Sequence, residues 1–537
     1  MRNVDIEAFP GALKVQKATA SLFFATALSA TFTADAATDI LTISGTNMTD
    51  YTTGTAVTVS STGTLPTGLS ASTNYFIIAV SSSTIKLATT IALANAGTAI
   101  NITDAGSGTH TIATVNPGTV NHIVRDTHGD IKFFHDSNGR VWYLTSGSTR
   151  VLLLNGNTLT NSSGQGLAFI RDNNATEISK KKYLFVFRNA LIDVVEITGT
   201  TQIETPSWTS GWQTMNTGSG AGNSHHALTG QDFIIYYCDG RYIGSIKELT
   251  TFDPANSATF TYTSQALDLP QLEIANWLEE LGTNLEIAGD TFNFIYPWDR
   301  LSNSYNLPIP VPETSIKRLK NIGNLVYILA GTKGNIYTTQ GSYVNFAKKL
   351  PDYLVNNSGT LQANPVTWGG ITSRNGVLLF GVAGLTSGNS GAYILYPDGR
   401  LVMDNIPSSG SGNVTALYAQ NDFYIMGHAS GGSYHTSTRY ASYEAVAHSG
   451  LYRLSDKTRK GALSTLEVQV AKPVATGHIR IGYRADTSSS FTTIDTYTAD
   501  GTAISFESDA GLIDLENIQV QVEMDGLFEL MEVRLLP

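Results

Sequence analysis

A short glycine-containing turn recurs four times in this 537-residue chain, and each copy leads into an apolar, strand-like run. In every copy a polar residue precedes the glycine, and Arg or Asn follows it. Glycine adopts positive φ at little cost, and Asn-Gly or Asp-Gly is favoured in two-residue hairpin loops. The pattern therefore predicts a chain built from β-hairpins. The copies are SNGRVWYLT at 137–145, CDGRYIGSI at 238–246, TKGNIYTTQ at 332–340 and PDGRLVMDN at 397–405.

The spacing of these turns indicates a repeated sheet. Their glycines stand at positions 139, 240, 334 and 399, and another turn, in FRNALIDV at 187–194, lies midway in the first interval. The repeat is about 50 residues long, which is close to the length of a β-propeller blade. A lone hairpin cannot bury its faces, so repeated hairpins have to pack side by side. Residues 114–457 are therefore predicted to form an all-β propeller of six or seven blades, with eight left open.

Composition narrows the classes of partner. Hydrophobic residues make up 42% of the chain and charged residues only 14%, with a net charge of -11. No basic stripe is visible in the sequence, so we expect no sequence-specific binding of nucleic acid. An acidic protein could still line a passage for DNA, because repulsion keeps DNA from sticking. The single cysteine, Cys238, excludes an internal disulfide, which favours assembly in a reducing compartment.

The first 35 residues are predicted to form an N-terminal strand segment. The stretch ATASLFFATALSATFTA at 18–34 has the small residues of a signal peptide. However, Asp5 and Glu7 stand where a signal peptide is basic, and the stretch is too rich in Ser and Thr for a membrane span. One or two buried strands are the preferred interpretation, and no membrane span is expected.

Two further β-units flank the predicted propeller. Residues 36–113 hold closely spaced apolar runs among Thr, Ala, Ser and Gly, which indicates a small accessory β-module. In 458–537 apolar residues alternate with polar ones, as strands with one buried face do, and this predicts a C-terminal β-sandwich. Asp525-Gly526 predicts a hairpin inside that sandwich. The alternating residues are Leu466, Val468 and Val470; Ile479, Ile481 and Tyr483; and Ile518, Val520, Val522 and Met524.

Histidines and aspartates gather in NHIVRDTHGDIKFFHD at 121–136. No two of these histidines have the i, i+4 spacing of a helical metal site, and no cysteine joins them. The preferred interpretation is a polar loop that enters a strand, without metal. His225 and His226 are adjacent, so in a strand their side chains point to opposite faces and cannot easily chelate one ion. The members of the cluster are His122, His128, His135, Asp126, Asp130 and Asp136.

Four carboxylates could supply the acid pair of a glycosidase. Two of them lie in LPQLEIANWLEELG at 269–282, which is the best candidate for a short helix in the chain. No sialidase-type repeat, phosphate-binding loop or nucleophile elbow accompanies these carboxylates, and solvated acids are the preferred interpretation. We therefore expect no enzymatic activity, no cofactor and no metal. The four carboxylates are Glu279, Glu280, Asp290 and Asp299.

Trp208 and Trp212 stand together in SWTSGW at 207–212. Exposed tryptophans stack on sugars or anchor protein interfaces, so these two residues are the candidates for contact with a glycan or a partner. Packing between blades would use tryptophans equally well. Both interpretations stay open on the sequence alone.

The accessory region carries a family resemblance. The order TGTLPTGLSASTNYFIIAV at 62–80, TIKLATT at 84–90 and AGTAINITDAGSGTHTI at 96–112 resembles a small β-module of tailed-bacteriophage virion proteins. The rest of the chain is similar in the style and order of its segments to phage tail-associated propeller proteins. The segments that carry this likeness are NLEIAGDTFNFIYPWDR at 284–300, NLVYILAGTKGNIYTTQGS at 324–342 and GLYRLSDKTRKGALSTLEVQV at 450–470.

The resemblance implies a structural component of a virion, assembled in the host cytoplasm. Its place would be the tail, nozzle or baseplate, where it scaffolds fibres or closes the tail end. The implied partners are other virion proteins (tail tube, fibres or adaptor) and further copies of the chain in a symmetric ring. Two alternatives remain: a module that binds a host-surface glycan and, behind it, a glycan hydrolase.

Overall fold

A computed structural model provides the structure of the chain, which is all-β apart from one described five-residue helix. The residues that it describes are 4–5, 13–15, 17–21, 28–45, 53–115, 118–125, 132–137, 140–144, 150–152, 166–171, 182–188, 190–197, 207–216, 225–248, 260–350, 366–385, 390–405, 413–420, 423–428, 431–439, 445–448, 452–453, 461–470, 477–485, 490–498, 502, 505–515, 517–526 and 529–536. No described helix is long and apolar enough to cross a membrane.

Seven four-stranded antiparallel sheets follow one another along the described chain, and we call them blades 1 to 7. Blade 1 comprises β10 (Val120–Arg125), β11 (Lys132–Asp136), β12 (Val141–Leu144) and β13 (Arg150–Leu152). Blade 2 comprises β14 (Gly166–Arg171), β15 (Lys182–Arg188), β16 (Leu191–Ile197) and β17 (Ser207–Thr214). Blade 3 comprises β18 (Ala227–Thr229), β19 (Ile234–Asp239), β20 (Tyr242–Glu248) and β21 (Phe260–Asp268).

The next three blades keep the same strand order. Blade 4 comprises β22 (Ala275–Leu281), β23 (Asn284–Gly289), β24 (Phe294–Trp298) and β25 (Ile309–Pro310). Blade 5 comprises β26 (Ile316–Ile322), β27 (Leu325–Ala330), β28 (Asn335–Thr339) and β29 (Val344–Lys349). Blade 6 comprises β30 (Thr367–Arg374), β31 (Val377–Ala383), β32 (Gly391–Leu395) and β33 (Leu401–Asn405).

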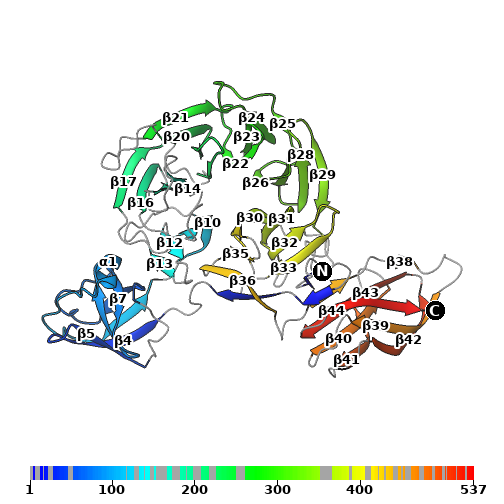
Figure 1. The fold of residues 1–537 in the computed structure, drawn as a ribbon, viewed down its shortest axis with the longest axis horizontal. Helices are drawn as coiled ribbons and strands as arrows, with labels where there is room; N and C mark the ends of the chain where they lie inside the picture. The colour runs from blue at the N-terminus through cyan, green and yellow to red at the C-terminus, as the bar shows by residue number, and fades with distance from the viewer. Residues whose placement is uncertain are drawn as a thin grey trace.

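The first strand of each blade lies at the centre of a ring. β10 contacts β14, each later first strand contacts the next, and β34 (Ala416–Gln420) contacts β10, so the circle closes (Figure 1). The prediction of a β-propeller is confirmed, and the blade count is seven. A closed ring leaves no long sheet edge exposed, which explains why short strands suffice.

Blade 7 is completed by the N-terminal part of the chain. Its sheet runs β34, β35 (Phe423–His428), β36 (Gly431–Arg439) and then β3 (Lys17–Ser21). β3 pairs antiparallel with β36, and Ser21 lies opposite Ser433. The last blade is thus built from two segments at far ends of the sequence. This pairing fastens the ring where the chain would otherwise leave it open.

Side-chain hydrogen bonds tie the inner strands to one another around the ring. Each bond joins a side chain of one blade to the backbone of a neighbouring blade, so hydrogen bonds as well as packing hold the blades together. The pairs are His122 with Leu167, Thr229 with Phe169, His226 with Leu278, Asn276 with Ile316, Arg318 with Gly369, and Thr415 with Val120.

Glycines allow blades 6 and 7 to approach closely. A Cβ on Gly369 would lie 1.8 Å from the Val414 carbonyl oxygen, and one on Gly370 would lie 2.2 Å from the Leu417 nitrogen. Any side chain at these positions would push β30 away from β34. The glycine pair therefore sets the spacing of this part of the ring.

Buried acids hold the hairpins of blades 4 and 5. Glu273 precedes β22 and accepts a hydrogen bond from the Tyr296 hydroxyl at 2.7 Å. Glu313 precedes β26 and accepts one from the Tyr337 hydroxyl at 2.9 Å. Both tyrosines lie on the third strand of their blade. This repeated Glu–Tyr pair locks the third strand to the entry of the first, and it satisfies groups that burial would otherwise leave unpaired.

A six-stranded closed barrel is inserted between β3 and blade 1. Its core is apolar, and one hydrophobic cluster joins Phe76 and Ile91 of the barrel to Val141 of blade 1. The barrel is therefore packed against the propeller rather than tethered to it. Its elements are β4 (Ser29–Asp35), β5 (Ile40–Ser44), β6 (Ala56–Ser61), β7 (Asn74–Ala79), β8 (Thr84–Ala88), α1 (Ile91–Asn95) and β9 (His110–Thr114).

Two sheets form the C-terminal unit. One runs β1 (Val4–Asp5), β2 (Leu13–Val15), β44 (Glu529–Leu536), β39 (Gly461–Val470) and β42 (Ser505–Leu515). The other runs β37 (Ala445–His448), β43 (Asn517–Gly526), β40 (Gly477–Arg484) and β41 (Thr492–Thr498), with β38 (Tyr452–Arg453) also paired to β43. All ten alternating apolar residues named in the sequence belong to its core or pack against it.

The structure moves several expected boundaries. β4 belongs to the barrel, although residues up to 35 were expected in a separate strand segment, because its partners are β5 and β9. The strands β1, β2 and β37 belong to the C-terminal sheets, although they precede residue 458. The stretch 18–34 does contain two strands, as expected, but they serve different units.

Turn chemistry was only partly anticipated. Gly240, Gly334 and Gly399 all have positive φ, as expected, whereas 138–139 lie outside the described residues. However, Asp239 pairs with Tyr242, so the central residues of that loop are Gly240 and Arg241 rather than Asp-Gly. The hairpin expected at Asp525-Gly526 was wrong, since β43 and β44 belong to different sheets.

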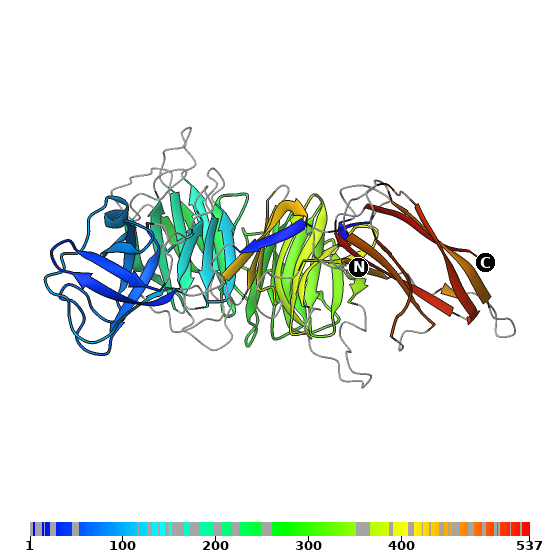
Figure 2. The same ribbon diagram turned by 90° about the horizontal axis from the view of Figure 1, so that it is seen from below.

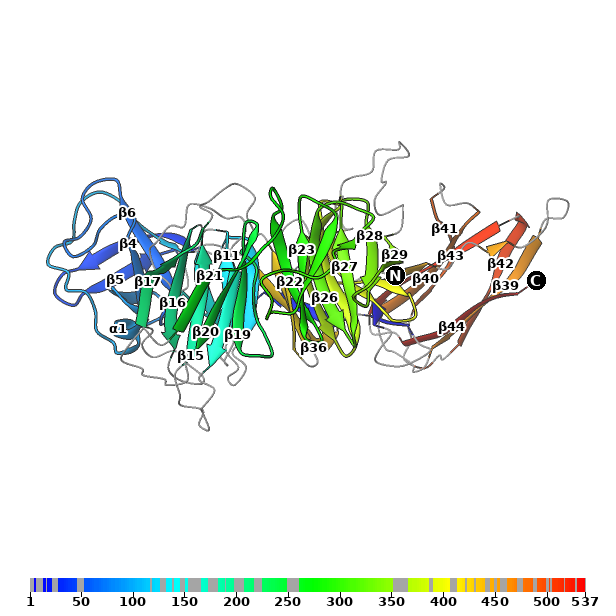
Figure 3. The same ribbon diagram turned by 90° about the horizontal axis from the view of Figure 1, so that it is seen from above.

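The barrel and the C-terminal unit lie at opposite ends of a flat disc (Figures 2 and 3). The N-terminal end of the chain lies beside the C-terminal unit, and β1 also contacts β33 of blade 6 (Figure 1). Segments from both ends of the sequence therefore join the disc to this unit. The molecule is elongated, with the propeller in the middle.

Candidate functional site: the central cavity

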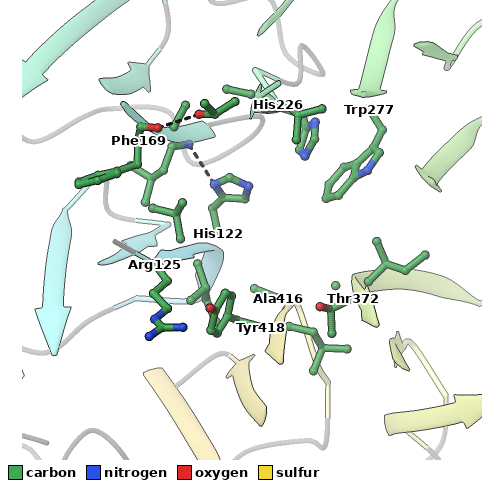
Figure 4. Close-up of a pocket in the computed structure, with 18 of the residues that line it drawn as sticks. His122, Arg125, Phe169, His226, Trp277, Thr372, Ala416 and Tyr418 are labelled. Atoms are coloured by element: carbon green, nitrogen blue, oxygen red, sulfur yellow. Dashed lines mark hydrogen bonds between the residues drawn. The ribbon is translucent and has the colours of Figure 1, made fainter. Parts of the chain in front are cut away.

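A cavity of about 670 Å³ lies between the inner strands of the propeller. All seven blades contribute to its wall, which is mainly apolar with a few polar groups (Figure 4). Cavities of this size and character are typical of small-molecule sites. The polar and charged residues in the described wall of this central cavity are Asn121, His122, Arg125, His226, Thr229, Glu279, Arg318, Lys320, Thr372, Thr415 and Tyr418.

His122 extends from β10 into the central cavity, as Figure 4 shows. Its Nδ1 accepts a hydrogen bond from the Leu167 backbone N–H at 2.9 Å. Burial, together with the smaller effect of the nearby charge of Arg318, lowers the pKa of His122 to about 4. The ring is therefore neutral at pH 7. Since Nδ1 is an acceptor, the proton of the neutral ring sits on Nε2.

His226 has the same arrangement on the opposite side of blade 2. Its Nδ1 accepts from the Leu278 N–H at 3.1 Å, and burial holds the pKa of the ring well below its usual value. The ring stacks on Trp277 with centroids 3.5 Å apart, and it meets His122 edge-on at 5.7 Å. The two imidazoles thus form a continuous wall with the indole.

Arg318 also packs against the Trp277 ring. Its guanidinium carbon lies 4.6 Å from the ring centroid, which is a cation–π distance. Its Nε and Nη1 donate to the carbonyl oxygens of Gly369 and Lys317 at 2.6 and 2.8 Å. Burial lowers the pKa of Arg318 to about 10, so the group remains charged at pH 7.

Lys320 and Glu279 form an ion pair in the same wall, at 2.8 Å. Glu279 also accepts from the Asn321 N–H at 3.1 Å. The described wall therefore holds three cationic side chains, those of Arg125, Arg318 and Lys320, and a single carboxylate. This balance is opposite in sign to the chain as a whole, whose net charge is -11.

The structure places the two described histidines of the stretch 121–136 on neighbouring strands of blade 1. His122 lines the central cavity, whereas His135 is fully buried on β11 directly opposite it, and burial lowers its pKa to about 3. Asp136 accepts hydrogen bonds from the Gly118 N–H at 3.0 Å and the Trp142 indole N–H at 2.8 Å, which is a structural role. Asp126, His128 and Asp130 lie outside the described residues.

His225 and His226 do point different ways. The Nδ1 of His225 lies 2.9 Å from the Cys238 carbonyl oxygen, inside blade 3, while His226 faces the central cavity. Cys238 is itself buried, and burial raises the pKa of its thiol. Among the described residues, no three histidine, cysteine or acidic side chains are grouped as a metal site would require.

The prediction of a short helix at 269–282 is wrong, and the observed strand changes the interpretation of Glu279 and Glu280. Residues 275–281 form β22, the inner strand of blade 4. Adjacent residues on a strand face opposite sides, so Glu279 reaches Lys320 of blade 5 while Glu280 faces blade 3. Glu280 pairs there with Arg300 at 2.5 Å and accepts from the Gln231 N–H. These two carboxylates therefore cannot act on one glycosidic bond.

The remaining two acids are engaged elsewhere. Asp290 pairs with Lys317 at 2.7 Å, and Asp299 accepts from the Leu301 and Ser302 backbone N–H groups at 2.9 and 2.8 Å. Asp299 thus stabilises the turn that follows β24. Neither carboxylate lines the central cavity.

Trp212 packs between blades 2 and 3. It meets Phe185 at 5.7 Å, Phe260 at 6.1 Å and Tyr262 at 6.0 Å, each edge-on. The ring is half-buried, and this arrangement is the inter-blade packing left open by the sequence. Trp208 lies in β17, and its backbone pairs with that of Val195 in β16. The structure does not describe the Trp208 side chain.

Sequence reasoning missed Trp277, Arg318 and Lys320. Trp277 was concealed by the incorrect helix, and the two cations had no recognised motif. One signal was available: in SIKRLKNI at 315–322, three cations stand among apolar residues inside a strand of an acidic protein. Charges inside a buried strand need a partner or a cavity.

No protein-family model matches the chain, and no curated protein matches it either. Among solved structures, it is similar to the β-propeller domain of Cps50 (Swd1) from Myceliophteria thermophila, with 10% identity, a TM-score of 0.40, and coverage of 60% of this chain and 97% of that one. BamB from Moraxella catarrhalis has 10% identity, a TM-score of 0.34 and coverage of 60% and 84%. YCF48 bound to D1 peptide has 10% identity, a TM-score of 0.38 and coverage of 59% and 91%. These likenesses concern the fold alone.

Proposed function

We propose that this protein is a non-enzymatic structural component of a tailed-phage virion, located in the tail, nozzle or baseplate. There it scaffolds fibres or closes the tail end. The proposal rests first on the resemblance of residues 62–112 to a phage β-module, and these residues include β7, β8, α1 and the first part of β9 in the barrel. The proposed role adds a function to the observed fold, and it requires no catalytic group.

The observation that carries the proposal is the way in which three β-units are joined. The barrel shares a hydrophobic cluster with blade 1, β3 closes blade 7, and β1 and β2 extend a C-terminal sheet. Each joint is made by packing or by strand pairing rather than by a single linker. A part that transmits force between neighbours in a particle needs this kind of connection, since packed interiors transmit strain.

The outer rim of blades 4 and 5 supports a ring of copies. Four large apolar side chains are strongly exposed there, between β24 and β25 and along β28–β29. Exposed large apolar side chains on two neighbouring blades are candidates for a protein interface, and a second copy is the occupant that a symmetric ring supplies. The exposed fractions are 91% for Leu301, 87% for Leu307, 64% for Tyr343 and 62% for Phe346.

The size of the central cavity bears on any DNA passage. A space of about 670 Å³ suits a small molecule, so a passage for DNA would run through the middle of a ring of copies. The net charge of -11 would then keep DNA from adhering to the ring.

The test is direct location of the chain. Antibodies raised against the full chain should label one end of purified particles of the phage that encodes it, and peptides of the chain should appear in those particles by mass spectrometry. Light scattering of the purified chain should give a mass that is a multiple of 57.5 kDa. Leu301→Ser with Leu307→Ser should lower that mass, while the surface change Arg400→Gln should not. Absence of the chain from purified particles would overturn the proposal.

A further inference from the structure

Arg318 is a buried cation without a salt bridge to a described carboxylate. Two of its nitrogens donate to backbone carbonyls, and its face covers Trp277. The charge of Asp290 acts on Arg318 and raises its pKa, but the Asp290 carboxylate is itself in contact with Lys317 at 2.7 Å. The only carboxylate in the described wall of the central cavity, that of Glu279, is already paired with Lys320. A buried charge that shares its nearest carboxylate with another cation is incompletely compensated, and the described wall holds more cations than carboxylates, so this site favours an anion.

Two imidazole N–H donors complete the polar side of the central cavity. The Nδ1 atoms of His122 and His226 are both occupied as acceptors, so each neutral ring carries its proton on Nε2. The rings lie 5.7 Å apart, and His226 is fixed by its stack on Trp277. Rigid, pre-oriented N–H donors beside a guanidinium are what a carboxylate or phosphate head group requires.

Much of the remaining wall is apolar. Side chains of blades 1, 2, 6 and 7 supply it, including Ile123, Leu167, Ile371, Ala416 and Leu417. A bare inorganic ion would fill little of the available volume and would leave this surface without a partner. The wall therefore favours an anion that carries an apolar body.

We propose that the central cavity is a binding site for a small organic anion, whose carboxylate or phosphate head meets Arg318, His122 and His226 and whose apolar part lies against blades 6 and 7. This site is separate from the scaffolding role, since the rim and the flanking β-units do not contribute to it. It adds a ligand-binding activity to the structural one.

Calorimetric titration of the purified full chain at pH 7.5 tests this site. The probes are sodium benzoate, sodium acetate and inorganic phosphate, with benzamide as the uncharged analogue of benzoate. Sodium chloride holds the ionic strength constant. Benzoate should bind saturably with a Kd of about 1 mM or tighter, and more tightly than acetate or phosphate because only benzoate fills the apolar part. Benzamide should bind at least tenfold more weakly.

Two variants locate the site. Arg318→Met removes the charge, and Thr372→Phe fills the cavity from blade 6 while leaving every charged group in place (Figure 4 shows Thr372 in the wall). Each should weaken benzoate binding at least tenfold. Arg400→Met is the matched control, because Arg400 is an exposed arginine paired with Asp398 outside the cavity, and it should bind benzoate as the unaltered protein does.

Several outcomes would overturn the proposal. They are no saturable heat from benzoate, acetate or phosphate; equal affinity for benzamide; or unchanged affinity in Thr372→Phe. If Arg318→Met does not fold, the Thr372→Phe result and the benzamide comparison still decide. Benzoate binding to a chain that is absent from phage particles would support this site and refute the scaffold, so the two proposals fail separately.

Discussion

Glu286 lies directly opposite Glu279 in the register of β22 and β23, and both carboxyl groups are buried. Opposed residues of an antiparallel pair share one face, so both belong to the side of blade 4 that faces blade 5. Glu279 has Lys320 as its partner, whereas neither oxygen of Glu286 has a described hydrogen-bond partner. Burial raises the pKa of both groups, that of Glu286 to about 7.

This difference predicts a pH-dependent stability. The carboxyl of Glu286 has a pKa near 4.5 when solvated, so between pH 4.5 and 7 the unfolded chain loses a proton that the folded chain keeps. The folded state then binds more protons, and its stability falls as the pH rises through this window. The full penalty, present above about pH 7, is on the order of 3 kcal/mol. Glu286→Gln should therefore raise the unfolding temperature at pH 8 and change it little at pH 4.5, measured by calorimetry.

The control for Glu286→Gln is Glu532→Gln, at a half-exposed carboxylate of the C-terminal unit. It should show no such pH-dependent gain. A Glu286→Gln effect of the same size at both pH values would mean that Glu286 does not titrate in this window.

Glu273 is predicted to be a stabilising residue of blade 4. Its Oε1 accepts from the Thr291 N–H at 2.9 Å, and its Oε2 accepts from the Tyr296 hydroxyl at 2.7 Å. Glu273→Ala removes the acceptor of both donors, of which the Tyr296 hydroxyl is buried, and should lower the free energy of unfolding by about 3 kcal/mol. Tyr296→Phe removes one bond and should lower it by about 1 kcal/mol. Chemical denaturation measures the free energy of unfolding of both variants. Equal losses in Glu273→Ala and Tyr296→Phe would show that the bond from Glu273 to the Thr291 N–H adds no stability.

The closure of blade 7 predicts the effect of a short deletion. Removal of residues 1–21 takes away β3 and exposes the edge of β36, so the first unfolding transition should fall by about 5 °C or more. Removal of residues 1–16 deletes β1 and β2 but keeps β3, and it should leave the propeller transition unchanged. Calorimetry with limited proteolysis distinguishes the two proteins. A propeller transition that is the same in both would show that the ring closes without β3.

Trp212 is predicted to stabilise the chain by packing. Trp212→Ala removes the ring that fills the space between Phe185, Phe260 and Tyr262, and it should lower the free energy of unfolding by about 3 kcal/mol. Tyr262→Phe loses only the hydroxyl, which donates to the Thr214 carbonyl and accepts from the Tyr237 hydroxyl, and it should cost about 1–2 kcal/mol. Denaturation curves of the two variants test this ranking, and a Trp212→Ala protein of unchanged stability would contradict the packing role.

Local patterns predicted the parts of the fold that local physics decides. Leu466, Val468 and Ile481 were identified as core residues because only one face of their sheets is buried, and such burial imposes a period of two. In β22, by contrast, Leu278 faces blade 3 and Glu279 faces blade 5. Burial on both faces removes the alternation, and the pattern that remained imitated a helix.

Long-range pairing explains what the sequence did not reveal. The match of β3 to β36 depends on backbone hydrogen bonds between distant segments, and such bonds leave no signature in side chains. The central cavity likewise draws on seven strands that are far apart in sequence. His122 and His226 were noticed as chemical groups, but their convergence with Arg318 follows only from the circular order of the blades.

The pairing of β3 with β36 also imposes a delay during synthesis. Ser21 and its partner Ser433 are 412 positions apart, from 21 to 433, so at about 5–20 residues per second roughly 20–80 s separate their appearance. Six blades and the barrel can be complete while β3 still awaits its neighbour. Another nascent copy on the same messenger offers an identical β36, so exchange of β3 between copies is the specific error that translation of this chain has to avoid.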